Sequence, residues 1–334
     1  MFKRLAVCAA AAMMLCSCGS SEKHQGSVFA MDTYMSLTAY GSSAEEGIKK
    51  ASEKLNELDK LWSATESGSE IFAVNSSEGK PVSVSDETAS LISFAKEMSS
   101  QTGGAFDITV YPIVEAWGFT TGEHSVPSEE RLNELLEVVG SDKITVSGSE
   151  ITLPTGSKLD LGAVAKGRAG DICADLMKEC GVTSAVLDLG GNIRTLGTKP
   201  DGSKWKIGLR DPFSEGIYAT LDVGETNIVT SGAYERFFEQ DGKTYHHIID
   251  PNTGRPAESG IASATVIGSD GRLCDALSTS LFVLGAKGAE QLYRSRHDFD
   301  YILVTDSGEV IMSEGVSGLI TFEPGFGEKV SVVK

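Results

Sequence analysis

The sequence predicts an α+β protein that folds as one compact unit of two sheet–helix lobes with mostly antiparallel strands. Strand patterns occur in groups rather than alternating one by one with helices, which argues against a doubly wound parallel sheet. Short alternating runs flank the turn signals Ser147-Gly148-Ser149 and Ser307-Gly308, as in antiparallel hairpins. No proline-rich linker or internal repeat divides the 334 residues, although this length would allow two domains.

The N-terminal half predicts one strand followed mainly by helices. Residues Val28–Tyr40 alternate like a strand, and apolar residues at three- and four-residue spacing predict an amphipathic helix over Ala44–Trp62. A second helix is expected from Glu87 to Ser99, before the stop signal Gly103-Gly104. The other elements expected here are a short helix over Ser128–Val138 and hairpin strands over Lys143–Val146 and Glu150–Leu153.

The C-terminal half predicts strands between helical segments. A helix over Ala163–Cys180 is closed by Gly181, and a buried strand over Ser184–Leu189 ends at Gly190-Gly191. Two further helices are expected over Arg272–Leu284 and Lys287–Arg296. The remaining expected strands are Trp205–Leu209, Ile217–Val223, Asn227–Thr230, Tyr245–Ile249, Ala262–Ile267, Tyr301–Thr305 and Glu309–Met312.

The chain is strongly acidic, with 29 basic and 47 acidic residues and a formal charge of −18. Such a surface repels polyanions, which argues against broad electrostatic binding to nucleic acid. A phosphate-bearing ligand must instead be met locally, by a metal ion, a helix N-terminus or a few fixed cations. The hydrophobic share of 40% and the charged share of 23% are typical of a globular protein.

The first residues predict export. Residues 1–17 resemble a signal peptide, because a short basic start precedes an apolar run from Leu5 to Leu15 that is too short to span a membrane. Loss of the basic residues Lys3 and Arg4 would change the formal charge from −18 to −20.

A cysteine near the end of the signal peptide predicts a lipid anchor. The run Leu15-Cys16-Ser17-Cys18 resembles the bacterial lipobox, in which the cysteine becomes the lipidated first residue of the mature protein. We therefore expect a lipid on Cys18, a polar tether over residues 18–27 and a folded domain over residues 28–334, held at the extracytoplasmic side of a bacterial membrane. The alternative is an ordinary signal peptide with incidental cysteines.

Three further cysteines, Cys173, Cys180 and Cys274, remain in the mature chain. Cys173 and Cys180 would lie about 10.5 Å apart along the axis of the predicted helix, which is too far for a disulfide. We expect all three to be free thiols that serve as small core residues.

The segment Leu159–Arg168 places a carboxylate, glycines and two cations where a strand runs into a helix N-terminus. Unpaired N–H groups and partial positive charge at such a terminus suit an anionic ligand. The alternative is a capping Asp160 with solvated Lys166 and Arg168, and the glycine spacing does not decide between the two.

Two oxygen-bearing residues on the helix after Arg272 could share one ion. Asp275 and Thr279 stand at positions i and i+4, so their side chains lie on the same side of the helix. Oxygen ligands favour Mg²⁺ or Ca²⁺ over zinc. The alternative is an Asp near the helix N-terminus and a Thr whose hydroxyl bonds back to the helix backbone.

Two neighbouring histidines precede the Pro/Gly turn of the segment Tyr245–Pro256. His247 and Ile249 would share one strand face, while His246 points to the other. A histidine here could accept a proton from an incoming hydroxyl near neutral pH, and a purely structural pair is the alternative.

The segment Gly103–Pro112 leads from a helix stop into an aromatic residue and a carboxylate. Phe106 could pack a planar ring, and Asp107 could accept a hydrogen bond from an imide or amine. Core packing followed by a turn is the alternative.

Several short motifs occur in order along most of the mature chain. They are Met31-Asp32-Thr33, Gly104-Ala-Phe-Asp107, Asp160-Leu-Gly-Ala-Val-Ala-Lys166-Gly167, Asp188-Leu-Gly-Gly-Asn192, Thr230-Ser231-Gly232, His247-Ile-Ile-Asp250-Pro251-x-Thr253-Gly254 and Asp275-Ala-Leu-Ser-Thr279. Together they resemble the ApbE family of FAD:protein FMN transferases, with the lipobox of a lipoprotein-type member. The resemblance runs from about Met31 to Leu284.

The resemblance implies an ApbE-like (T-fold-like) domain and a Mg²⁺-dependent enzyme that splits FAD, releases AMP and links FMN through its phosphate to a Thr or Ser. It implies that His247 activates the acceptor hydroxyl and that Mg²⁺ is held by the main-chain oxygen of Ala163 with Asp275 and Thr279. The implied partners are FAD, a membrane reached through the lipid anchor, and extracytoplasmic FMN-binding acceptor proteins of redox-driven pump or electron-transfer type. The implied FAD contacts are Met31, Ala105, Phe106, Asp107, Asp160, Lys166 and Ile249, the last through its backbone.

One position departs from the family pattern. Where many members place a tyrosine in a Ser-x-Tyr pattern near the adenine pocket, this chain has Ser63-Ala64-Thr65. Two other functions therefore stay open. One is an FAD pyrophosphatase that releases FMN and AMP because water replaces the acceptor, and the other is a flavin-binding lipoprotein without turnover.

Overall fold

A nine-stranded sheet forms the centre of the computed structural model, which describes residues 22–334. Every neighbouring pair of strands in this sheet is antiparallel except β17 and β19, so the predicted α+β fold with mostly antiparallel strands is confirmed. The predicted signal peptide and Cys18 lie outside the described residues. In spatial order the strands are β1 (Lys23–Ala30), β2 (Thr33–Tyr40), β6 (Ser184–Asp188), β7 (Asn192–Gly197), β10 (Thr226–Gly232), β15 (Ile261–Gly268), β16 (Asp300–Thr305), β17 (Val310–Ser313) and β19 (Val330–Val333).

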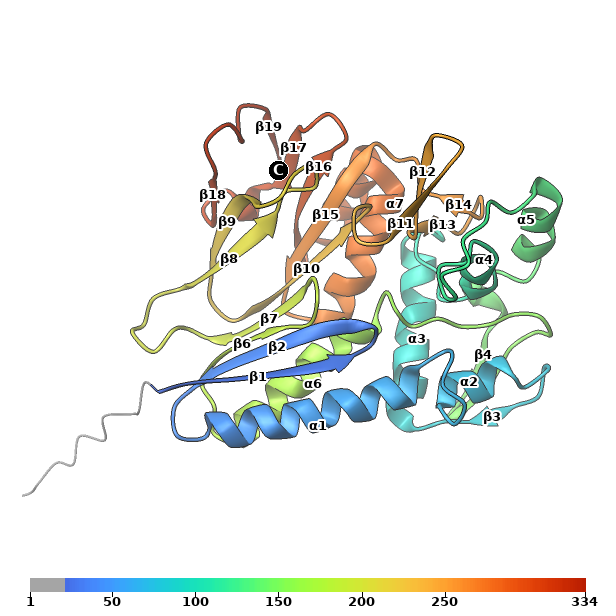
Figure 1. Cartoon of the computed structure of the whole chain (residues 1–334), viewed down its shortest axis with the longest axis horizontal. Coiled ribbons are helices and arrows are strands. Elements are labelled where there is room, and N and C mark those ends of the chain that lie inside the picture. The colour runs from blue at the N-terminus through green and yellow to red at the C-terminus, as the bar shows by residue number, and fades with distance from the viewer. Residues whose placement is uncertain (1–21) are drawn as a thin grey trace, which may run out of the picture.

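The two faces of this sheet are covered differently (Figure 1). One face packs against the helices α1 (Ala44–Trp62), α6 (Ala165–Glu179) and α7 (Gly271–Arg296). The other packs against a three-stranded sheet through an apolar cluster that includes Tyr218 and Ile302. That second sheet has the order β18 (Ile320–Phe322), β9 (Ile217–Val223), β8 (Trp205–Arg210).

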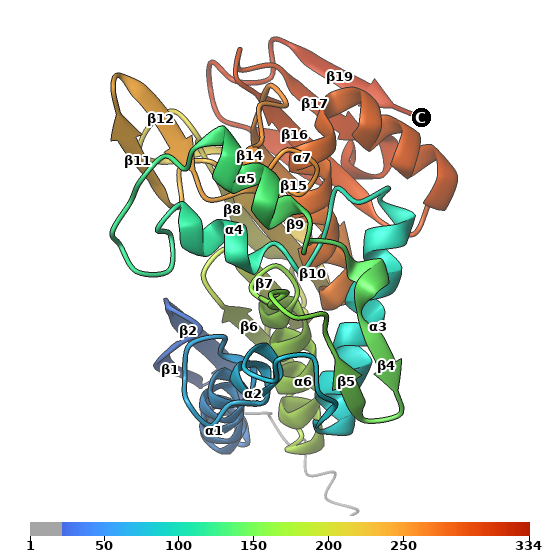
Figure 2. The same cartoon turned by 90° about the vertical axis from the view of Figure 1, so that its right-hand side faces the viewer.

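A smaller lobe of short elements lies on the side of α3 (Asp86–Gln101) away from the large sheet in Figure 1 and faces the viewer in Figure 2. Its aromatic cluster joins Trp117, next to α4, with Phe238 and Tyr245 of the hairpin β11–β12. Its elements are α2 (Glu70–Asn75), α4 (Tyr111–Ala116), α5 (Glu129–Leu136), β3 (Val82–Ser83), β4 (Thr145–Ser147), β5 (Glu150–Thr152), β11 (Phe237–Gln240), β12 (Lys243–His246), β13 (Ile249–Asp250) and β14 (Arg255–Pro256). Short 3₁₀ turns occur at Ser141–Lys143, in this lobe, and at Glu314–Val316, beside the second sheet.

The N-terminal strand predicted over Val28–Tyr40 is a hairpin. β1 and β2 are joined at Met31 and Asp32, whose φ angles of 50° and 57° are left-handed. A two-residue turn does not disturb the alternation of apolar and polar residues, so the sequence pattern runs through it unbroken. β1 begins at Lys23, and residues 23–27, expected in the tether, therefore belong to the sheet.

Two other predicted boundaries depend on single positions. The pair of helices expected after Arg272 forms one long element that breaks at Gly285, where φ is 68° and ψ is 179°. The strand expected over Tyr245–Ile249 is interrupted, because His247 and Ile248 lie between β12 and β13.

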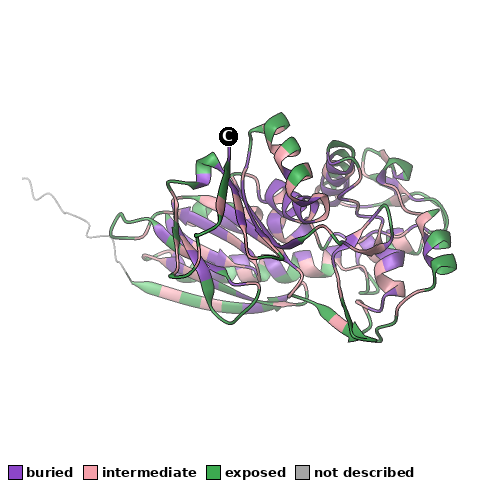
Figure 3. Cartoon of the chain, turned by 90° about the horizontal axis from the view of Figure 1, so that it is seen from above, coloured by how far each residue is buried: buried purple, intermediate pink, exposed green. Residues whose placement is uncertain are grey.

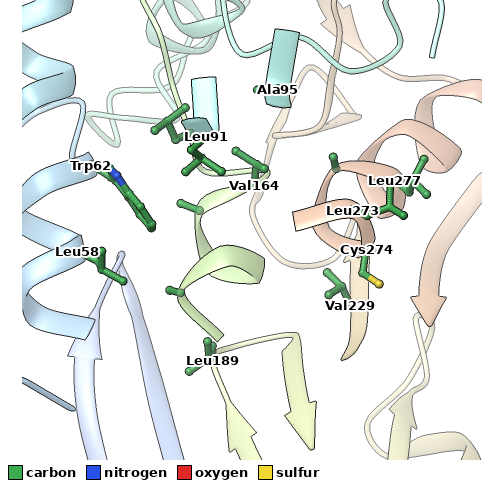
Figure 4. Close-up of a cluster of buried hydrophobic side chains, with 14 of the residues drawn as sticks. Leu58, Trp62, Leu91, Ala95, Val164, Leu189, Val229, Leu273, Cys274 and Leu277 are labelled. Atoms are coloured by element: carbon green, nitrogen blue, oxygen red, sulfur yellow. The ribbon is translucent and has the colours of Figure 1, made fainter. Parts of the chain in front are cut away.

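The main hydrophobic core lies between the helices and the large sheet (Figure 3). Side chains of Trp62, Leu91, Val164 and Leu273 come together there from α1, α3, the residue before α6, and α7 (Figure 4). Val164 is completely buried, which anchors the chain at the start of α6.

The three cysteines of the described chain are free thiols, as predicted. Cys173 and Cys274 are core residues, but Cys180 is only half-buried because it follows the last turn of α6. None of the helices over residues 22–334 combines the length and the apolar character needed to cross a membrane.

Candidate active site

The crossing of α6 and α7 brings two segments together that are more than a hundred residues apart. A Cβ atom on Gly167 would lie 2.0 Å from the carbonyl oxygen of Gly271, and one on Gly271 would lie 2.2 Å from the oxygen of Gly167. Both positions therefore require glycine. At this crossing the amide of Gly167 donates a hydrogen bond of 2.8 Å to Oδ2 of Asp275.

Asp275 lies in the first turns of α7 with only 4% of its surface exposed. Burial raises the pKa of this carboxyl, although the charge of Lys166 and the amides of Gly167 and Asn192 act in the opposite direction. The balance leaves a buried carboxylate whose negative charge is incompletely compensated by the protein. Such a group favours a bound cation.

The turn before α6 offers a further oxygen, the main-chain carbonyl of Ala163. In a regular helix the amide of Gly167 would donate to the carbonyl of Ala163, four residues earlier, but here it donates to Asp275. Within residues 22–334 no hydrogen bond to the Ala163 carbonyl oxygen is found. Asp160 shapes this turn, since its Oδ1 accepts the amide of Gly162 at 2.8 Å.

Thr279 follows Asp275 by one helical turn and is half-buried. Its hydroxyl oxygen lies 3.3 Å from Oγ of Ser231 on β10. Asp275, Thr279 and the Ala163 carbonyl are all hard oxygen donors, the kind that Mg²⁺ prefers. No cluster of three or more His, Cys, Asp or Glu that could hold a metal occurs in the described chain, so an ion here would need oxygens from water or from a ligand's phosphates as well.

His247 is oriented by the backbone of Arg236. Both its amide, at 3.0 Å, and its ring Nδ1, at 3.2 Å, lie within hydrogen-bond distance of the Arg236 carbonyl oxygen. A carbonyl can only accept, so Nδ1 carries the proton and Nε2 keeps a free lone pair. Although part of the residue is exposed, burial of the ring lowers the pKa of His247 to about 3, and the nearby charges of Arg236, His246 and Lys166 act in the same direction. The hydrogen bond to the Arg236 carbonyl opposes this shift only in part.

The neighbouring His246 has a structural position. Its Nε2 lies 3.1 Å from the carbonyl oxygen of Ala257, and its ring packs edge-on against Phe282 at a centroid distance of 5.4 Å. Burial lowers the pKa of His246, which keeps the ring neutral. His246 therefore fits the structural alternative, whereas His247 has a ring nitrogen free to accept a proton.

The low pKa of His247 makes a testable prediction about pH. The ring should stay neutral from pH 8 to pH 5, so its NMR signals, assigned by their loss in His247→Gln, should not titrate in this range. Because the unfolded histidine binds its proton first, near pH 6.5, the free energy of unfolding should fall as the pH drops below that value. A midpoint between pH 6 and pH 7 for this ring would contradict the prediction.

Asp107 holds the loop after α3 in shape. Its Oδ1 accepts from the amide and hydroxyl of Thr109 at 2.8 and 2.6 Å and from the hydroxyl of Ser141 at 2.7 Å. Its Oδ2 accepts from the amide of Ser141 at 2.8 Å. Phe106 and Ala105 are buried, so the core-and-turn alternative describes the side chains of this segment.

The remaining FAD positions expected from the sequence present mainly backbone. Met31 lies in the turn between β1 and β2, where its amide donates to Oδ1 of Asp59 on α1 at 2.9 Å. Ile249 is buried in the cluster with Ile113 and Trp117, so its side chain points away from solvent. A ligand at this position would meet the backbone, as expected.

Asn192, on β7, belongs to this site although the sequence suggested no role for it. Asn192 acts on the Asp275 carboxyl, and Arg194, two residues along the same strand face, reaches Asp171 on α6 at 3.3 Å. Nδ2 of Asn192 is buried near the Asp275 carboxyl and makes no hydrogen bond within the described residues. The sequence signal was the motif Asp188-Leu-Gly-Gly-Asn192, which ends at this residue.

Lys166, Asp275, Thr279 and His247 thus lie in one region around the α6–α7 crossing. Lys166 lies near enough to shift the pKa of both Asp275 and His247. The hairpin that carries Met31 also contacts the loop before Asn192. Its Thr33 packs so closely on Gly190 that a Cβ atom there would lie 2.3 Å from the Thr33 hydroxyl oxygen. A carboxylate, hydroxyls, a cation and a neutral histidine are therefore gathered where an anionic ligand and a metal ion could be held.

Comparison with known proteins finds consistent similarities. The sequence profile of the ApbE family matches residues 31–303. An FAD:protein FMN transferase of Klebsiella pneumoniae (strain 342) is 34% identical over 265 residues, which are 78% of this chain and 82% of that protein. The crystal structure of the ApbE protein from Thermotoga maritima has a TM-score of 0.83 at 30% identity and covers 88% of this chain and 98% of that one. A flavin transferase ApbE from Vibrio cholerae has a TM-score of 0.79 at 28% identity and covers 89% and 99%.

Proposed function

This chain belongs to the ApbE family and is a transferase, and from this premise we propose that it transfers FMN from FAD to a Thr or Ser of an acceptor protein, with Mg²⁺, releasing AMP. The observation that carries the proposal is the buried Asp275, held by the Gly167 amide at 2.8 Å, with Lys166 close enough to shift the pKa of both Asp275 and His247. Phosphoryl transfer asks mainly for positioning and charge stabilisation, which these groups supply.

The reaction needs a proton acceptor but no protein nucleophile. The acceptor hydroxyl oxygen forms a bond to the phosphorus of the FMN half, and the bond between that phosphorus and the bridging oxygen breaks, so AMP leaves with that oxygen. The hydroxyl proton passes to Nε2 of His247, whose lone pair is free because Nδ1 donates to Arg236.

The metal ion would be held by Asp275, Thr279 and the carbonyl of Ala163. When bound, Mg²⁺ neutralises the diphosphate and the negative charge that develops on its oxygens. Lys166 adds a fixed positive charge in the same region, where its Nζ lies 3.3 Å from the carbonyl oxygen of Gly162. Together they overcome the repulsion that this acidic chain exerts on a dinucleotide.

The proposed location is the extracytoplasmic side of a bacterial membrane. The apolar run from Leu5 to Leu15 and the lipobox-like Cys18 support export and lipidation. The acceptors would then be extracytoplasmic FMN-binding proteins of redox-driven pump or electron-transfer type.

A direct assay tests the transfer. The purified chain is incubated with FAD, MgCl₂ and an acceptor flavoprotein. In a parallel control reaction, a related flavin transferase modifies the same acceptor. We expect a covalent mass gain of one FMN on the acceptor and an equal amount of AMP. No mass gain, while the related enzyme modifies the same acceptor, would overturn the proposal, and flavin binding without any AMP would favour a binding lipoprotein.

Hydrolysis of FAD by water is the second candidate function, and Thr65 motivates it. Thr65 is exposed just beyond α1, with its hydroxyl 3.2 Å from Oγ of Ser63, and offers no ring to cover a bound adenine. We predict that Thr65→Tyr lowers AMP release measured without acceptor, because an aromatic ring excludes water. Thr65→Ser is the matched control. Unchanged AMP release in Thr65→Tyr would show that this position does not control access of water.

A further inference from the structure

A chain of hydroxyl groups links β10 to the helix that carries Asp275. Oγ of Ser278 donates to the carbonyl oxygen of Asp275 at 2.9 Å. Oγ of Ser231 lies 2.8 Å from Oγ of Ser278 and 3.3 Å from Oγ1 of Thr279. Ser278 is fully buried, whereas Ser231 and Thr279 are half-buried.

The carbonyl at the end of this chain determines the direction of every hydrogen bond in it. A carbonyl only accepts, so the single hydroxyl proton of Ser278 points at Asp275. Ser278 must then accept from Ser231, since two oxygens without a proton between them would repel at 2.8 Å. With its own proton used, Ser231 accepts from Thr279.

Thr279 differs in this respect from its neighbour on the same helix. Ser280 donates back to the carbonyl of Ala276 at 2.6 Å, which is the usual arrangement for a hydroxyl inside a helix. For Thr279 the described chain shows no such bond, and its hydroxyl contacts Ser231 instead. The alternative in which Thr279 serves only the helix backbone is therefore excluded for this structure.

We propose that Ser231 and Ser278 are positioning residues that hold the proton of Thr279 away from Asp275, so that the lone pairs of Oγ1 are presented to the cation. The proposal rests on the proposed function, because it assigns Thr279 as a ligand of the divalent ion in that reaction. The hydroxyl chain moves no proton. Its role is to keep Thr279 an acceptor, as a metal ligand must be.

A double-mutant cycle between Ser231→Ala and Thr279→Val tests this inference. The full chain is loaded with FAD, binding of Mn²⁺ is followed by electron paramagnetic resonance, and the Mg²⁺ concentration for half-maximal FMN transfer is measured separately. Ser231→Ala should weaken Mn²⁺ binding and raise the Mg²⁺ requirement by about 10-fold or more, the usual effect of losing a partner of a metal ligand. The double variant should be no worse than Thr279→Val alone, because Ser231 acts only through Thr279.

Two matched variants separate positioning from folding. Ser231→Thr keeps a hydroxyl and should restore the metal affinity lost in Ser231→Ala. Ser280→Ala removes a fully buried hydroxyl of α7 that lies outside the hydroxyl chain and should leave Mn²⁺ binding unchanged.

The outcomes distinguish this inference from the proposed function. If the wild type transfers FMN but Ser231→Ala binds Mn²⁺ normally, or the two substitutions are additive, the hydroxyl chain has no positioning role. If the wild type binds Mn²⁺ and the cycle is non-additive but no FMN is transferred, the hydroxyl chain stands and the proposed function is wrong.

Discussion

Asp275→Asn is expected to lower FMN transfer by about 100- to 1,000-fold, the usual effect of removing one preorganised charge from a reaction centre. The substitution keeps the shape of the side chain, and the Asn oxygen can still accept from the Gly167 amide. Only the negative charge is lost. Transfer is measured as the covalent FMN mass gain of the acceptor, at saturating FAD and a fixed Mg²⁺ concentration.

The same variant should be as stable as the wild type, or more stable, at pH 7 without divalent cations. Burial raises the pKa of Asp275 in the folded chain, so its charged form is favoured in the unfolded chain. The pKa of this carboxyl in an unfolded chain is about 3.8. The stability that the carboxyl contributes is therefore present below that pH and is lost as the pH rises above it. Mg²⁺ should raise the melting temperature of the wild type and not that of Asp275→Asn.

Asp270→Asn provides a matched control on the same helix. Asp270 caps the N-terminus of α7, where its Oδ1 accepts the amides of Arg272 and Leu273 at 2.9 and 3.3 Å. Asparagine caps helices about as well, so activity should change little. Equal losses in the two variants, or a normal Mg²⁺ response in Asp275→Asn, would contradict the assignment of Asp275 as a metal ligand.

His247→Gln is expected to lower transfer by about 100-fold or more while FAD affinity stays nearly unchanged, because a general base acts on the acceptor hydroxyl and not on the flavin. The glutamine amide can still donate to the carbonyl of Arg236, so the local fold is kept. FAD binding is measured by flavin fluorescence, and transfer by the mass gain of the acceptor.

The adjacent histidine offers the control for this experiment. The native ring of His246 contacts Ala257 and Phe282 rather than Arg236. The variant His246→Gln retains a hydrogen-bond donor toward the carbonyl of Ala257. It should keep most of the activity. An equal loss of FAD affinity and transfer in His247→Gln would instead assign His247 to flavin binding.

Most regular elements could be predicted from the sequence, because they depend on local periodicity and stop signals. The amphipathic helix over Ala44–Trp62 has the predicted ends, and the break in α7 falls at Gly285, between the two predicted helices. The turn at Met31 and Asp32 could not be seen, since a two-residue turn preserves the alternation on both sides. The interruption at His247 depends on contacts with Arg236 and Ala257 rather than on the residues of the strand itself.

The candidate site residues were chosen from the sequence, but the sequence did not decide how several of them are held. Asp275 and Thr279 share a helix face at a spacing that any helix imposes. The same spacing left open whether Thr279 serves an ion or its own backbone, and only the position of Ser231 excludes the second choice in this structure. Asp107 was a candidate for ligand binding, yet its oxygens are occupied by Thr109 and Ser141.

The amino-acid sequence by itself determined the acidic surface, the order of the elements and the residue types available for binding a phosphate and a cation, because these are local properties. Tertiary structure alone decided that Gly167 and Gly271 touch, which tautomer His247 adopts and where the hydroxyl of Thr279 points. The reason is physical. Each of these features is a close contact between atoms far apart along the chain, and no local pattern encodes which distant atom will be the partner.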